Sequence, residues 1–275
     1  MLKPLSRLSL ALVFTVLFAA AAPAQQAQPD IYVTVSYIKV LPGQDQAYRT
    51  YLTTTGKQLF KELMAADASF QYWSSARMMF QGTEPGSDFD YVGASVYAGA
   101  PPEPGAIPEA VYMKATGMSG PDLAKKLASM RTIVGTEILR RRAGTTTPMP
   151  KEGDVRVTAR IRIKPGMGSE YYEMAKTMTE PMAQARAANG ELNAWSLWSR
   201  VFPAGAGTSY DALGVTYFKN LASAVKGLDP AKGLETFLKV HPGKNYATYI
   251  NNGGEYSELQ QRMVMQVIAA AERAK

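Results

Sequence analysis

The side chains that most often perform chemistry in proteins are scarce in this sequence. His241 is the one histidine, and the chain has no cysteine. Thiolate nucleophiles, disulfides, cysteine-based metal sites and a zinc site with two histidines are therefore excluded, and no metal site is expected. His241 precedes Pro242 and Gly243 at an expected helix end. It is a candidate general base or axial haem ligand, with an ordinary structural histidine as the alternative.

Arginines are spaced in a way that suits anion binding. The segment 155–163 alternates strictly between apolar and polar residues, which is typical of a strand. Successive side chains of a strand point to opposite faces, so Arg156, Arg160 and Arg162 share one face. Guanidinium groups stay charged and form bidentate hydrogen bonds with carboxylate or phosphate. We therefore predict an anion-binding surface, with Arg160 and Arg162 as its ligands.

Aromatic residues of the same half are expected near this surface. Trp195, Trp198 and Tyr217 lie in alternating segments and are predicted to line an apolar pocket with a few oriented polar groups. Core packing is the alternative for these aromatics. For the arginines, the alternatives are a solvated edge or ion pairs with carboxylates such as Glu137 or Asp211.

The elements that must position these residues occur twice, about 120 residues apart. Alternating segments at 31–38 and 155–163 both run into Pro-Gly, at 42–43 and 165–166, and then into a periodic helix. In the second helix Pro181 is expected to kink or end the helix.

Two further segments match in each half. Residues 70–74 correspond to 192–196, and 89–97 correspond to 210–217, the latter pair sharing an aromatic residue, Asp, two residues and Gly. Gly-rich hairpin loops are expected between them, from Gly82 to Ser87 and from Pro203 to Ser209. The tail at 256–275 should be a strand by analogy with 131–142, although its alanines favour helix; the sequence leaves that element open.

Strand–helix–strand–strand–helix–strand is the ferredoxin-like plan, here expected at 29–144 and 154–275 with a linker at 145–153. The quoted segments resemble the dimeric α+β barrel superfamily, which includes the antibiotic-biosynthesis-type monooxygenases and the NIPSNAP-like proteins. The resemblance implies an α+β fold in which two tandem units pair their sheets into an intramolecular barrel. Haem-binding members make haem at His241 the alternative to having no cofactor. No catalytic residue is carried over.

The first residues indicate export. Lys3 and Arg7 precede an apolar stretch, and Ala22-Pro23-Ala24 predicts signal-peptide cleavage after Ala24; a retained anchor is the alternative. The apolar stretch is shorter than a membrane span, and no integral membrane segment is expected after cleavage. The net charge of +7 falls to +5 without the leader and has no dense basic block. We therefore expect a periplasmic or secreted protein that does not bind nucleic acid.

These observations favour an exported barrel protein that binds a small, anionic and aromatic ligand. One alternative is an oxidoreductase or monooxygenase of the barrel superfamily, either cofactor-independent or haem-using. Another is a structural interaction module of the cell envelope, for which a filled barrel is expected. Whether the chain forms a homo-oligomer stays open.

Overall fold

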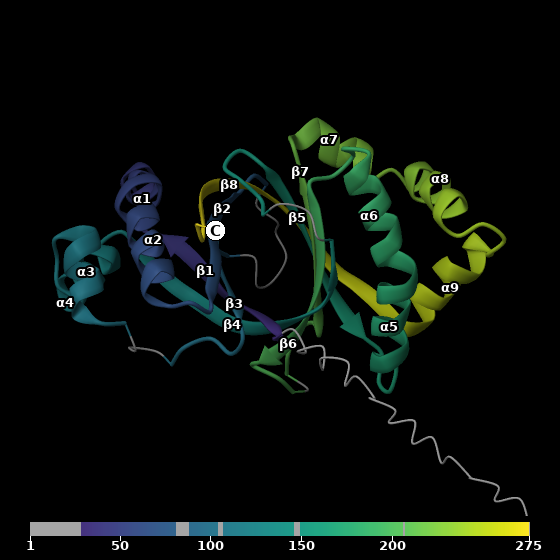
Figure 1. Ribbon diagram of the computed structural model, residues 1–275, viewed down its shortest axis with the longest axis horizontal. Helices are drawn as coiled ribbons and strands as arrows, with labels where there is room; N and C mark the ends of the chain where they lie inside the picture. Colours follow the sequence, from purple (N-terminus) through teal and green to yellow (C-terminus); the bar gives the residue numbers. More distant parts are fainter. Residues whose placement is uncertain (1–28, 81–87, 104–106, 146–148, 206, 275) are drawn as a thin grey trace, which may run out of the picture.

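The protein is a mixed α+β structure built around a β-barrel. The computed structural model describes residues 29–80, 88–103, 107–145, 149–205 and 207–274. Within these ranges, eight antiparallel strands close into a barrel, and the helices lie against two opposite outer sides of it (Figure 1). The α+β class predicted from the sequence is confirmed.

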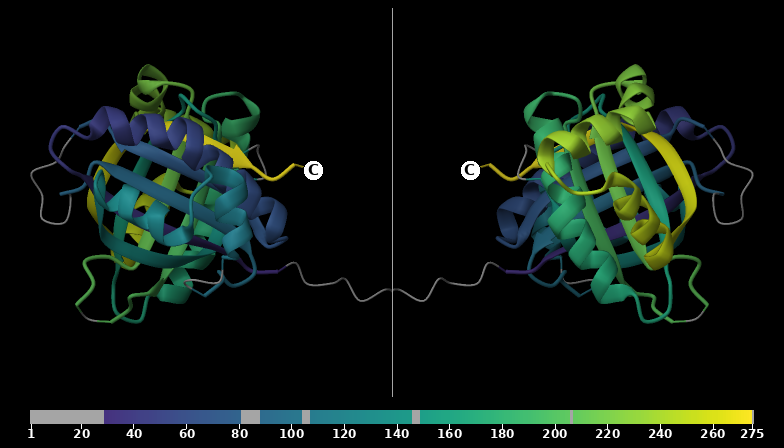
Figure 2. Two further views of the ribbon diagram at one scale, coloured as in Figure 1. Left: turned by 90° about the vertical axis from the view of Figure 1, so that its left-hand side faces the viewer. Right: turned by 90° about the vertical axis from the view of Figure 1, so that its right-hand side faces the viewer.

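Each half contributes four strands to the barrel and one layer of helices outside it. The two views of Figure 2 show α1 to α4 across the sheet of the first half and α5 to α9 across that of the second. The first half contains β1 (Ile31–Val40), α1 (Asp45–Tyr51), the π-helical turn η1 (Leu52–Gly56), α2 (Lys57–Ala66), β2 (Phe70–Met78), β3 (Tyr91–Ala98), α3 (Glu109–Thr116), α4 (Gly120–Ala128) and β4 (Arg131–Gly144). The second half contains β5 (Val155–Ile163), α5 (Gly168–Met174), η2 (Ala175–Thr179), α6 (Glu180–Ala188), β6 (Ala194–Phe202), β7 (Ala212–Phe218), α7 (Leu221–Gly227), α8 (Pro230–Val240), α9 (Tyr246–Tyr256) and β8 (Ser257–Glu272).

Strand order is the same in the two halves. The barrel runs β1-β3-β2-β8-β5-β7-β6-β4, so the first half reads β4-β1-β3-β2 and the second reads β8-β5-β7-β6. The pairs β2–β8 and β4–β6 join the halves and close the barrel. Strands β1 and β5 thereby form opposite walls of one interior.

The two faces of each strand have different surroundings. On β5, Val155 and Val157 pack on the helix side with Leu192 and Phe218, while Arg156 and Thr158 face the interior. The apolar–polar alternation at 155–163 therefore separates a helix-side core from the barrel interior, as expected for a period of two.

Turns at the strand ends follow the predicted chemistry. Gly43 and Gly166 have φ of +78° and +81°, a region that glycine enters without a steric penalty. Pro181 does not end the helical segment, because α6 continues to Ala188. Proline lacks an N–H, and the wider hydrogen-bond spacing of η2 directly before it accommodates the missing bond.

The closing element of the chain is the strand β8, despite its alanines. Pairing with both β2 and β5 outweighs the weak helix propensity of that segment. The expected leader at 1–28 and the loop from Gly82 to Ser87 lie outside the described residues. Among the residues that are described, no helix combines the length and the apolarity needed to cross a membrane.

Candidate functional site in the barrel interior

The barrel interior contains a cavity of about 250 Å³. It is bounded mainly by aliphatic side chains of the inward strand faces, with a few polar groups at one end. Residues that line it from opposite walls include Val33, Val35, Tyr37, Tyr72, Val96, Leu139, Arg156, Thr158, Trp195, Ser196, Trp198, Val215, Tyr217, Met263 and Met265. A concave, mostly apolar space with few polar groups is the usual form of a small-molecule site.

Arg156 and Thr158 supply unsatisfied polar atoms to this cavity. Arg156 is 5% exposed, and its Nη2 donates to the sulfur of Met265 at 3.0 Å. Its Nε and the hydroxyl of Thr158 are buried and have no partner among the described residues. A buried cation without a carboxylate is costly, since burial removes its hydration and a thioether is a weak acceptor. An anion in the cavity would relieve that cost.

Aromatic side chains also border the cavity. Trp198 donates its indole N–H to Ser196 at 2.7 Å, so the ring presents its apolar faces. Tyr72 donates to the carbonyl of Pro150 at 2.8 Å. Burial raises the pKa of Tyr72, which therefore stays protonated. Pro150 belongs to the expected linker, and it forms part of the cavity wall.

A buried polar cluster closes the other end. Glu137 accepts hydrogen bonds from the hydroxyls of Tyr37, at 3.2 Å, and of Tyr210, and its other carboxylate oxygen lies 3.0 Å from Nη2 of Arg200. The Arg200 guanidinium lies 3.6 Å from the centre of the Tyr210 ring. Burial, reinforced by the charge of Glu137, raises the pKa of Tyr37. Glu137 is therefore a fully compensated buried charge.

The structure separates the two predicted arginine ligands from the aromatic pocket. Trp198 and Tyr217 line the cavity, whereas Trp195 borders it and packs against the helix-side clusters. Arg160 and Arg162 do not line it. Arg160 lies at the outer side of the polar cluster, in an open depression of about 700 Å³, where its Nη1 donates to Gln261 at 3.0 Å. Arg162 lies farther out on the same strand, half-exposed.

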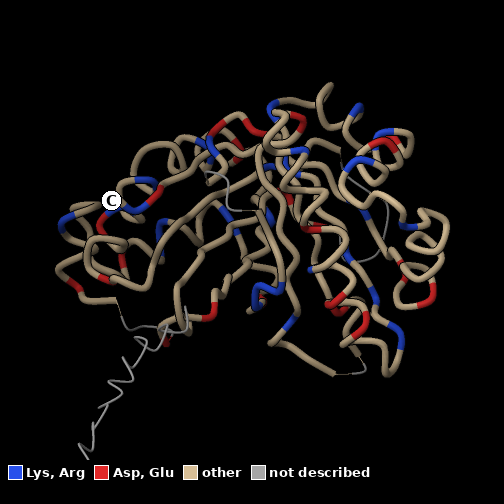
Figure 3. The backbone as a smooth tube through the Cα atoms, turned by 45° about the vertical axis from the view of Figure 1, so that its right-hand side comes forward, with Lys and Arg blue, Asp and Glu red and all other residues tan. Residues whose placement is uncertain are grey.

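The ion-pair alternative holds for Arg162, whose Nη1 lies 3.4 Å from Asp211. Its position near the end of β5 places it at the rim, because each residue advances the strand by about 3.3 Å. Elsewhere, basic and acidic residues are interspersed along the backbone (Figure 3). The alternation thus predicts the shared face correctly, but position along the strand decides which arginine reaches the cavity.

His241 lies outside the barrel at the end of α8. It is 7% exposed, its ring packs on Phe237, and its Nε2 lies 2.9 Å from the carbonyl oxygen of Met178. A carbonyl only accepts, so Nε2 carries the proton. This is the environment of a structural histidine, and it offers no open face to a haem iron. Among the described residues, no cluster of three or more histidine or acidic side chains suits a metal ion.

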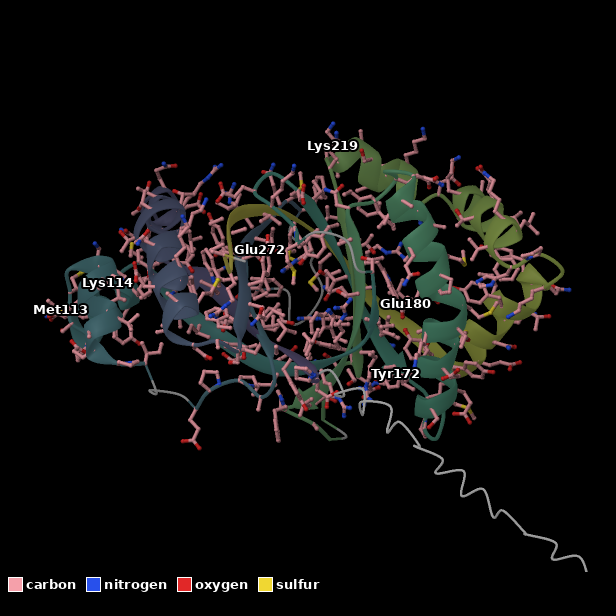
Figure 4. The ribbon with its side chains drawn as sticks, viewed as in Figure 1. Met113, Lys114, Tyr172, Glu180, Lys219 and Glu272 are labelled. Carbon is pink, nitrogen blue, oxygen red and sulfur yellow. The ribbon has the colours of Figure 1, made fainter. Side chains whose placement is uncertain are left out.

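Side chains fill the layers between the strands and the outer helices (Figure 4). On the second half, for example, the Arg142 guanidinium lies 4.8 Å from the ring of Tyr172, which Figure 4 labels on α5.

The first half is packed less completely, and a cavity of about 280 Å³ remains between its sheet and α1 to α4. Ser36, Ser75 and Arg131 line this helix-side cavity, and the buried Ser75 hydroxyl has no described partner.

Sequence reasoning did not identify the polar cluster. The correspondence of 70–74 with 192–196 places Arg200 at the position of Met78, and the backbone agrees. Met78 N donates to Asp90 O just as Arg200 N donates to Asp211 O, so Arg200 corresponds to Met78. Arg200 therefore faces the interior. The register of the aromatic-Asp motif carries the signal that would have found it.

Comparisons with known proteins agree with this architecture. No protein-family model matches the chain, and no curated protein matches its sequence. A candidate monooxygenase from Fusobacterium nucleatum subsp. nucleatum is 9% identical with a TM-score of 0.57, covering 90% of this chain and 96% of its own. One from Lactobacillus acidophilus is 10% identical with a TM-score of 0.54, covering 90% and 98%.

A third solved structure, of an anthrone oxidase-like protein, is 6% identical with a TM-score of 0.50 and covers 90% of this chain and 95% of its own. Identities this low establish likeness of fold alone. That likeness extends over nearly the whole described chain.

Proposed function

We propose that this protein is an oxidoreductase of the monooxygenase type that binds a small aromatic anion inside its barrel. The observation that carries the proposal is Arg156, a buried guanidinium in an apolar cavity whose described partner is a methionine sulfur. Such a charge is stabilised when a ligand supplies the missing carboxylate, phenolate or enolate. The named activity of two structural neighbours, candidate monooxygenases, supports oxidation as the reaction.

The chemistry follows from what Arg156 does to a bound acid. A cation in a water-poor site favours the anionic form of a nearby phenol or enol and lowers its pKa. That electron-rich form is the one that reacts with O₂ directly. For a phenol the balance is phenol plus O₂ giving quinone plus water, with the ring oxidised, one oxygen atom entering it and the other leaving as water. No step requires a bound cofactor.

We infer further that the chain is a tandem pair of ferredoxin-like units, whose sheets form the barrel intramolecularly. The shared strand order and the π-helical turns at 52–56 and 175–179 support this reading. Export to the periplasm or the exterior remains part of the proposal, on the strength of the leader sequence.

Binding without turnover is the second reading, and the same cavity supports it. A purely structural role is less well supported, because it predicts a filled barrel and this barrel contains a cavity.

The test pairs Arg156→Met with Arg77→Met, whose arginine is half-exposed on the outer face and pairs with Asp45. Aromatic carboxylates, phenols and their neutral analogues are titrated by calorimetry, and O₂ uptake is followed for every binder. We expect Arg156→Met to weaken anion binding at least thirtyfold, equivalent to about 2 kcal/mol, and Arg77→Met to leave it unchanged. Equal affinities in both variants would refute the site, and binding without O₂ uptake would leave only the binding reading.

A further inference from the structure

The helix-side cavity of the first half lies outside the barrel, and the proposed function makes no use of it. Its volume is about 280 Å³, and it lies between the sheet and the helices α1 to α4. Much of its wall consists of leucines from these helices and the turn η1, namely Leu52, Leu59, Leu63, Leu123 and Leu127. Among the described residues that line it, Arg131 is the only charged one. The cavity is therefore an apolar space with a single cation on its wall.

Arg131 brings this cation to the cavity without a carboxylate beside it. Its Nε is buried and has no partner among the described residues. Tyr48 and Tyr51 line the same cavity. Burial raises the pKa of each phenol to about 12, and the nearby charge of Arg131 opposes that rise. Both phenols therefore stay protonated within the electrostatic range of Arg131. A carboxylate bound here would be stabilised by the guanidinium through charge-assisted hydrogen bonds.

The sheet side of the cavity is formed by small and polar residues. Ser36 and Ser75 both pair with Gly93, one from each of the strands that flank β3, and all three line the cavity. Ser75 is 1% exposed, and its hydroxyl has no described partner. An unpaired hydroxyl in a dry core is destabilising. The space over Ser75 is therefore expected to hold solvent or a ligand rather than to be a dry packing defect.

The second half lacks both features at the equivalent positions. Leu197, which is buried in a packed cluster, takes the place of Ser75. Ser257 begins β8 at the register position at which Arg131 begins β4. The small residue under the helices and the cation beside them therefore occur together in the first half, and the shared strand plan does not require either.

We propose that this helix-side cavity is a second binding site, whose ligand is an unbranched carboxylate of about six to eight carbons. Arg131 binds the carboxylate, and the leucines of the helices pack on the alkyl chain above Ser75 and Gly93. The cavity has the volume of roughly nine liquid water molecules, which matches the about eight to ten non-hydrogen atoms of such an acid. An unbranched chain is the slimmest apolar body, and it suits the space left between the side chains of a sheet and those of its covering helices. This site does not depend on the proposed oxidation in the barrel.

Calorimetric titration of Arg156→Met, in which the barrel site lacks its cation, isolates the helix-side cavity. Octanoate should bind this variant at one site per chain and at least tenfold more tightly than octan-1-ol, because only the acid offers Arg131 a charge. From butanoate to octanoate the affinity should rise about fourfold with each methylene group. Decanoate should gain nothing over octanoate, because its chain exceeds the cavity.

Two further substitutions, each made in the Arg156→Met protein, locate the site. Arg131→Met should remove the preference for octanoate over octan-1-ol. Ser75→Leu should weaken the binding of both ligands at least tenfold, because the larger side chain fills the space that the alkyl chain needs. Arg77→Met removes a half-exposed arginine of β2 that pairs with Asp45, and this control should change neither affinity. Thermal unfolding without ligand verifies that each variant is folded.

The outcomes are independent of the barrel site, because Arg156 is absent throughout. If octanoate does not bind, or if it binds equally well after Arg131→Met or after Ser75→Leu, the assignment of this cavity is wrong. A rise in affinity that continues past octanoate would indicate adsorption to an apolar surface and would also overturn it. Wild-type protein that fails to bind aromatic anions would refute the barrel site and leave this second site standing.

Discussion

The two halves of the chain share a strand order and differ in what they place on equivalent strands. On the inward face of β1 stand Val33 and Val35, and at the same register positions β5 carries Arg156 and Thr158. One wall of the barrel is therefore apolar and the opposite wall is cationic. Two identical subunits would have to place the same residues on both walls. The two walls of this barrel belong to different segments of one chain, so their inward residues can differ.

The helix-facing sides of the two sheets also differ: on this side the first half is the less completely packed one. Ser75 pairs with Gly93 on the first half exactly where Leu197 pairs with Gly214 on the second. Leu197 is 2% exposed within a packed cluster, whereas Ser75 borders the helix-side cavity. The first half therefore keeps space between its sheet and helices at a level where the second half is filled. Each half is specialised on a different face of the same sheet plan.

Removing the carboxylate that compensates the polar cluster should have the largest effect on stability. Glu137→Leu leaves Arg200 buried beside Arg160 without its anion, and we expect the free energy of unfolding to fall by about 3–5 kcal/mol in urea denaturation. Arg77→Met breaks the half-exposed pair with Asp45 from its exposed side and should cost less than about 1 kcal/mol. Similar losses in the two variants would show that the cluster is not a compensated buried charge.

Exchanging the equivalent helix-facing residues Leu197 and Ser75 tests whether the two halves differ in their helix-side packing. Leu197→Ser should cost about 3 kcal/mol or more, because it opens a cavity in a packed cluster and buries a hydroxyl. Its counterpart Ser75→Leu enters existing space and should cost much less. Thermal unfolding of both variants measures the difference, and equal costs would mean that the two helix-side cores are packed alike.

Arg156→Met should stabilise the ligand-free protein although it weakens anion binding. Arg156→Met removes an uncompensated buried charge and keeps most of the side-chain volume. We expect it to raise the free energy of unfolding of the ligand-free protein by about 1–2 kcal/mol. Chemical denaturation without ligand is the measurement. A loss of stability would mean that Arg156 serves the fold rather than a ligand.

The smallest effect is expected at Ser75. Its buried hydroxyl has no described partner, so Ser75→Ala should be neutral or stabilising by up to about 1 kcal/mol. Ser95→Ala, on the adjacent strand and lining the same cavity, provides a comparison. A clear loss of stability in Ser75→Ala would reveal a hydrogen bond to water or to a ligand.

Much of the fold was accessible from local pattern. The repeat spacing, the Pro-Gly turns and the alternation at 155–163 predicted the strands and the side on which Arg156, Arg160 and Arg162 would lie. These signals are readable because a strand has a period of two and a turn has few permitted residues. Helix continuity through Pro181 and the strand at 257–272 were not accessible, since neighbouring elements overrode local preference there.

The candidate site, too, was only partly predictable from the sequence. The sequence by itself determined that no cysteine or histidine-pair chemistry is available and that a strand of the second half bears cations on one face. Only the tertiary structure decided that Arg156 reaches the cavity while Arg162 stops at the rim, and that Glu137, Tyr210 and Arg200 meet. The reason is physical: closing a barrel brings together side chains from strands far apart in the chain, and their depth depends on register and stagger, which no single segment encodes.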